Sequence, residues 1–119
     1  MLFSIKHKQK KDDGDEEIVI GLVEPLGVDT NNKKVVLHIK IYRTALKDID
    51  GLSKSLCELS IRNVFKGNYT ELEYPTQSKR FNIYLVKSNM GNKSTDLLKF
   101  ASEMTIRLSD KIHELTNAK

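Results

Sequence analysis

The clearest pattern in the chain is an alternation of apolar and mostly polar positions from residue 35 to residue 42. A period of two is typical of a strand with one buried face. We therefore expect an inward set and an outward set, and these are Val35, Leu37, Ile39 and Ile41, and then Val36, His38, Lys40 and Tyr42. A second alternating run spans 80–87, where we expect Phe81, Ile83 and Leu85 inward and Asn82, Tyr84 and Val86 outward.

Three further segments favour strands. Residues 2–7 carry a few apolar side chains, and 18–23 is a continuous β-branched run of the kind found in a central strand. Residues 69–74 alternate around Leu72. The turn formers at 75–79 then join this segment to the run at 80–87, which predicts a hairpin.

Two segments have the spacing of amphipathic helices. The first runs from about Asp48 to Lys66, with Leu52, Leu56 and Leu59 on one side. The second begins at a cap at Ser94 or Thr95 and ends near Thr116. Its apolar stripe consists of Leu97, Ala101, Met104, Leu108, Ile112 and Leu115.

These elements predict a single α+β domain over residues 1–119. The order is βββαββα, with a mainly antiparallel five-stranded sheet and both helices on one face, because each apolar stripe must be covered. No helix connects the first three strands, which argues against a parallel sheet. Lysines and then acidic residues crowd residues 8–16, and we expect a flexible charged loop there.

Composition narrows the functional classes only slightly. The formal net charge is +4, which permits an acidic partner without requiring one. Cys57 is the only cysteine, so no internal disulfide can form, and a reducing compartment is the simplest assumption. We expect no secretory leader, because lysines follow after only a few apolar residues, and the sequence contains no run of about 20 apolar residues. We expect a cytoplasmic protein that does not enter a membrane.

The outward face of the predicted sheet is the first candidate for function. Tyrosine rings can stack on bases, and lysine or arginine side chains can contact phosphates. A surface for nucleic acid or a nucleoprotein complex would use Lys40, Tyr42, Arg43, Lys79, Arg80 and Tyr84. The chain has no RNP-type motif, and only 7% of its residues are aromatic, so this pattern is not specific.

A protein-interaction or assembly module is the alternative hypothesis. Val36 and Val86 on the expected outward face suit contact with a regulatory or inhibitory partner. The last helix also carries Leu98, Phe100 and Ile106 away from its main stripe, and an apolar excess of this kind often marks an interface. A homodimer through this helix or through the sheet face would use that surface.

Catalytic and cofactor signatures are weak throughout. Lys93, Ser94 and Thr95 precede the last helix and could form an anion site, although ordinary helix capping explains them better. The glycines of a phosphate-binding loop are missing, because Lys87 and Asn92 occupy those positions. The three histidines share no metal-ligand spacing. We expect no enzyme, no metal and no cofactor.

Overall fold

The computed structural model describes residues 1–29, 34–66, 69–73, 81–89 and 97–118. Its strands are β1 (Phe3–Lys11), β2 (Gly14–Asp29), β3 (Lys34–Tyr42), β4 (Tyr69–Glu73) and β5 (Phe81–Asn89). Its helices are α1 (Arg43–Asp48), α2 (Lys54–Val64) and α3 (Leu97–Thr116). The predicted turn at 75–79 and the caps at Ser94 and Thr95 lie outside the described residues.

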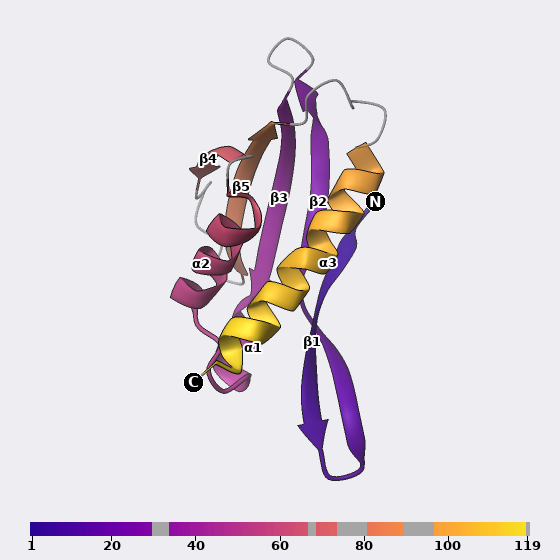
Figure 1. Cartoon of the computed structure of the whole chain (residues 1–119), viewed down its shortest axis with the longest axis vertical. Coiled ribbons are helices and arrows are strands. Elements are labelled where there is room, and N and C mark those ends of the chain that lie inside the picture. The colour runs from indigo at the N-terminus through magenta and orange to yellow at the C-terminus, as the bar shows by residue number, and fades with distance from the viewer. Residues whose placement is uncertain (30–33, 67–68, 74–80, 90–96, 119) are drawn as a thin grey trace.

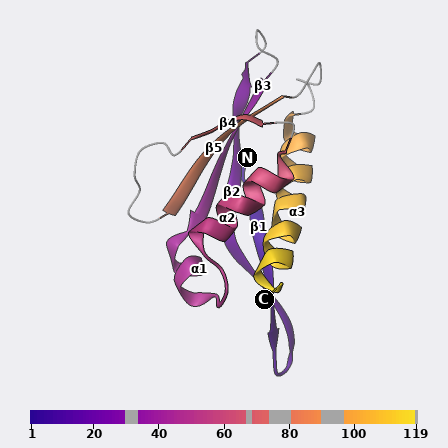
Figure 2. The ribbon, with the colours of Figure 1, turned by 60° about the vertical axis from the view of Figure 1, so that its left-hand side comes forward.

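The α+β class is confirmed, with β1, β2 and β3 forming an antiparallel sheet. Backbone pairing continues from β3 to β5 and from β5 to β4, which gives the strand order β1-β2-β3-β5-β4. Figure 1 shows α2 and α3 lying across one face of this sheet, and Figure 2 shows the same arrangement from the side. The other face of the sheet carries neither of these two helices.

The core lies between the sheet and the two longer helices. Ile39 and Ile41 of β3 are fully buried, as are Leu108 and Ile112 of α3. The inward set predicted for residues 35–41 is therefore correct, because all four members have no exposed surface. Two consecutive residues of β2, Ile20 and Gly21, are also buried, since the β1–β2 pairing shifts by one residue opposite Ile5.

The helix predicted over 48–66 is wrong in extent, because α2 spans only Lys54–Val64 and a separate helix, α1, covers Arg43–Asp48 before it. Gly51 separates them with a φ of 83°, a conformation that glycine adopts without strain. Ser53 then begins α2, and its hydroxyl oxygen accepts a hydrogen bond from the Leu56 amide at 3.1 Å. The element order thus has one more helix than predicted. The buried side of α2 contains Cys57 and Ile61, whereas Leu59 is 51% exposed.

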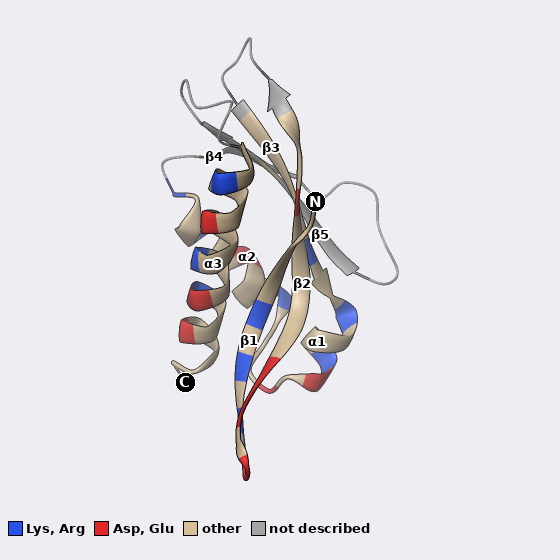
Figure 3. Ribbon diagram, turned by 90° about the vertical axis from the view of Figure 1, so that its right-hand side faces the viewer, with Lys and Arg blue, Asp and Glu red and all other residues tan. Residues whose placement is uncertain are grey.

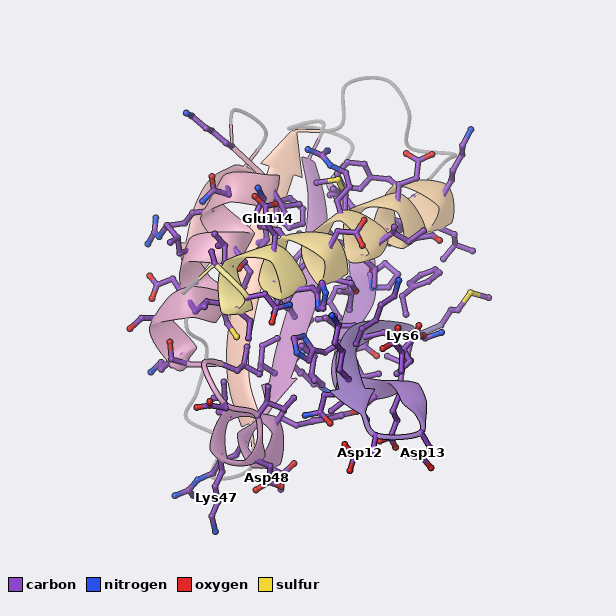
Figure 4. All side chains as sticks on the ribbon, turned by 60° about the horizontal axis from the view of Figure 1, so that its bottom comes forward. Lys6, Asp12, Asp13, Lys47, Asp48 and Glu114 are labelled. Atoms are coloured by element: carbon purple, nitrogen blue, oxygen red, sulfur yellow. The ribbon has the colours of Figure 1, made fainter. Side chains whose placement is uncertain are left out.

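Residues 8–16 belong to a β-hairpin, so the predicted loop is wrong. Lys11 of β1 pairs with Gly14 of β2, and only Asp12 and Asp13 form the turn (Figure 4). Lys8 and Lys10 of β1 lie opposite Glu17 and Asp15 of β2, and these pairs of opposite charge stabilise the hairpin (Figure 3). In Figure 1 this hairpin extends beyond the ends of the helices, and the molecule measures 51 × 29 × 25 Å.

Candidate functional site

Pairing between β3 and β5 reverses the faces predicted for β5. Tyr84 lies opposite the buried Ile39, and Val86 lies opposite Leu37 and is itself fully buried. Directly opposite residues in an antiparallel pair share a face of the sheet. Position 84 therefore belongs to the helix-covered face and not to the face of Lys40. The face of Lys40 instead contains positions 81, 83 and 85 of β5. They pair with Tyr42, Lys40 and His38, respectively.

Three of the predicted binding residues come together where β3 ends. Lys40 is half-buried, Tyr42 packs partly against the core, and Arg43 is exposed as the first residue of α1. Lys79 and Arg80 lie outside the described residues, as do the anion-site candidates Lys93, Ser94 and Thr95. Of the six predicted binding residues, the structure therefore describes the side chains of Lys40, Tyr42 and Arg43, and the β3–β5 register assigns position 84 to the face opposite to that of Lys40.

The sheet face that α2 and α3 leave uncovered is called the open face below. Among the described side chains it carries Lys6, Glu17, Val19, Leu22, Glu24, Leu26, Val36, His38 and Lys40. Val19 is 46% exposed and Leu26 is 53% exposed, although both are large apolar residues. Leu26 occupies a bulge of β2 beside Gly27, which pairs with Val36. Four of these nine residues are apolar and five are ionisable, so the open face combines exposed apolar side chains with charged ones.

Charges on the open face are close to groups of opposite sign. Lys6 Nζ lies 3.4 Å from Glu17 Oε1 across the β1–β2 pair. His38 Nδ1 lies 3.7 Å from Glu24 Oε1. Burial and the nearby Lys40 ammonium lower the pKa of His38, and Glu24 opposes that shift only in part. This mixture of positive and negative groups differs from the uniformly basic surface with which proteins bind a phosphate backbone.

A second cluster lies where the C-terminal half of α3 crosses the edge strand β1. His7 is 3% exposed, and its ring centroid is 5.1 Å from that of His113 in an edge-to-face contact. His7 Nδ1 is buried and has no hydrogen-bond partner among the described residues. Burial lowers the pKa of His7, and repulsion from His113 lowers it further. No spacing along the chain indicates this pair, because its members lie at opposite ends of the sequence.

Two cavities flank the histidine pair, and His113 lines both. One has a volume of about 670 Å³ and also touches His7, Lys8, Lys10, Asp50 and Asn117. The other, of about 310 Å³, is lined by Lys6, Ser109 and Asp110, among others. No three histidine, cysteine, aspartate or glutamate side chains within the described part of the chain are grouped so as to hold a metal ion.

Cys57 does not supply a nucleophile at either place. Its side chain is fully buried in the core under α2, and burial raises the pKa of its thiol to about 12. A thiol with such a pKa is almost entirely protonated near neutral pH, and the thiolate is the reactive form.

Comparisons with known proteins identify no relative. No protein-family model matches the chain, and neither the curated proteins nor the solved structures contain a significant match. Within the described residues, no helix is both long enough and apolar enough to cross a membrane. Any functional conclusion therefore depends on the open face and the histidine pair themselves.

Proposed function

We propose that this chain is a non-catalytic protein-interaction module that self-associates through its open face. The observation that carries the proposal is the exposure of Val19 and Leu26 on a sheet face that neither α2 nor α3 covers. The β3–β5 register adds positions Phe81, Ile83 and Leu85 to the same face. Exposed apolar side chains on one side of a sheet are stabilised when a second layer packs on them.

Charge favours a second copy of this chain as the occupant. Lys6 and Lys40 share the open face with Glu17 and Glu24, so two identical faces related by a two-fold axis can align opposite charges. A uniformly basic or acidic face would repel its own copy. Electrostatic complementarity of this kind fixes register and orientation in an interface.

The size of the face is sufficient for a dimer. The face is formed by four strands, β1, β2, β3 and β5, with neighbouring strands about 4.8 Å apart. With about eight residues in each strand and a rise of about 3.4 Å per residue, the face covers roughly 500 Å² per protomer. Two such faces bury about 1,000 Å², which is where specific protein interfaces begin. We therefore expect a reversible dimer of modest affinity.

Nucleic-acid binding is the rival hypothesis. It would use Lys40, Tyr42 and Arg43 at the end of β3. The register assigns position 84 to the face opposite to that of Lys40, and Glu17 and Glu24 would repel phosphates. Both observations favour the protein interface.

Light scattering and sedimentation over a concentration series test the proposal. We expect the mass to rise toward that of a dimer and to fall only slightly with salt between 0.1 and about 0.5 M, because burial of apolar side chains drives association while salt screens the charge pairs. Leu26→Lys should lower the association constant at least tenfold. Leu59→Lys is the matched control, since Leu59 has a similar exposed fraction but lies on α2.

Three results would overturn the proposal. A strictly monomeric wild type at millimolar concentration removes it outright. An association that Leu26→Lys leaves intact but Ile106→Lys abolishes would place the contact on α3, where Ile106 is 59% exposed. Oligonucleotide binding that weakens steeply with salt and is lost in Lys40→Glu would support the rival hypothesis.

A further inference from the structure

The C-terminal half of α3 is held on β1 by two neighbouring contacts. The backbone amide of Lys6 donates a hydrogen bond to Ser109 Oγ at 3.1 Å, on the side of β1 that has no strand partner. One residue further along β1, the His7 ring packs edge-to-face on His113, one helical turn beyond Ser109. Ser109 thereby protects a backbone donor of the edge strand, a role that natural sheets commonly assign to covering elements.

We propose that the contact between His7 and His113 is an acid-sensitive latch that holds the C-terminal half of α3 on the edge of the sheet. The latch is closed when the His7 ring is neutral, because a neutral imidazole can pack edge-to-face on its neighbour without repulsion. A proton on His7 would place a charge in a buried position where its Nδ1 has no hydrogen-bond partner among the described residues. The His113 ring, 5.1 Å away, adds to the cost of that charge.

Charged groups surround the pair without neutralising it. On β1 the neighbours are Lys6, Lys8 and Lys10, and on β2 they are Asp15, Glu16 and Glu17, which lie opposite lysine or glutamine positions of β1. Asp50 contributes from the segment between α1 and α2, and Asp110, Lys111 and Glu114 from α3. Two of these carboxylates already form ion pairs. Glu17 pairs with Lys6, and Glu114 Oε2 lies 3.0 Å from Lys111 Nζ.

The direction of the pKa shift agrees with this geometry. Burial is the main cause that lowers the pKa of His7, and His113 is the second, whereas no carboxylate offsets them. Because the pKa of His7 is lowered while the contact is closed, the His7 ring binds a proton more readily after the contact has opened. The latch is therefore at full strength above the ordinary value of 6.5 and weakens as pH falls toward the lowered value.

Opening of the latch has a specific structural consequence. When the C-terminal half of α3 leaves β1, the Lys6 amide loses Ser109 as its acceptor and becomes exposed at the sheet edge. His113 lines both cavities, so water has access to its ring from either cavity. The rings can therefore be hydrated without displacement of the central core. The opening is then local, and β3 stays paired with β2.

Amide hydrogen exchange measured by NMR between pH 7.5 and 5 tests the latch. We expect the protection factor of the Lys6 amide to fall by up to about tenfold per pH unit below 6.5, since opening binds one proton. The amide of Ile39 in the sheet centre should keep its protection over the same range. The ring resonances of His7 should titrate below 6.5 in the same samples.

Histidine variants separate the latch from a general loss of stability. His7→Phe keeps a buried ring without a titrating group, and we expect the pH dependence of Lys6 protection to disappear. His113→Gln removes the repelling neighbour, so the dependence should weaken and move to higher pH; it also serves if His7→Phe does not fold. His38→Gln is the control, because His38 also has a lowered pKa but lies on the open face.

Two outcomes would overturn the latch. One is a Lys6 protection factor that stays constant between pH 7.5 and 5 in the wild type. The other is a pH dependence that persists in His7→Phe, that is unchanged in His113→Gln, or that disappears in His38→Gln.

Discussion

Gly21 is the residue at which the fold is least tolerant of a side chain. It lies in the bulged part of β2, and a Cβ at this position would collide with the backbone carbonyl oxygen of Lys40 on β3. A backbone atom of a central strand cannot move aside without disturbing the β2–β3 ladder. The close approach of two strands therefore depends on glycine here.

Gly21→Ala is expected to lower the free energy of unfolding by about 1–3 kcal/mol, the usual range for overpacking. Urea denaturation of the variant and the wild type measures this difference. A matched substitution, Gly14→Ala, meets no atom within 4 Å and changes only the backbone strain at a φ of 125°. A Gly21→Ala protein within about 0.5 kcal/mol of the wild type would contradict the packing that the structure shows.

Cys57 should be chemically inert in the folded protein. Its side chain has no exposed surface, and its thiol has a pKa of about 12. We expect a disulfide reagent such as Ellman's reagent to label less than one tenth of Cys57 at pH 8 within an hour, and to label all of it in denaturant. Rapid and complete labelling of the native protein would mean that α2 does not cover this side chain.

Among the elements, α2 depends most visibly on one terminal residue. Ser53 supplies the hydroxyl acceptor for the Leu56 amide, directly after the Gly51 turn that ends the preceding segment. Ser53→Ala should cost about 1 kcal/mol of stability, and Ser53→Asp should restore most of it. Thermal unfolding measures both changes. Equal stability of Ser53→Ala and Ser53→Asp would show that this cap is not what begins the helix.

At the same scale, the sequence indicates some elements and leaves others open. The stripe of α3 and the inward set of β3 follow from period alone, because polar residues interrupt them regularly. In β5 both alternating sets contain apolar residues, so the sequence alone does not say which set faces the helices. The backbone register with β3 determines this. The hairpin at 8–16 was missed because its charges were considered singly, although lysines and acids face one another across the strands.

At the scale of the whole molecule, the candidate sites depend on contacts that pattern does not encode. His7 and His113 come into contact because α3 packs on β1, and no spacing along the sequence predicts that contact. The exposure of Leu26 arises from a bulge that moves one residue of β2 out of register. Composition correctly excluded an internal disulfide, since only one cysteine is present.

The open face is the central element of the account at this scale, because it combines exposed apolar side chains with charges of both signs. A dilution series followed by ¹H–¹⁵N correlation spectra, from millimolar to low micromolar, tests it most directly. The account predicts concentration-dependent shifts at Val19, Leu22, Leu26 and Lys40, with Leu59 and Leu98 on the helices unchanged. Shifts confined to the helices, or spectra that do not change on dilution, would contradict it.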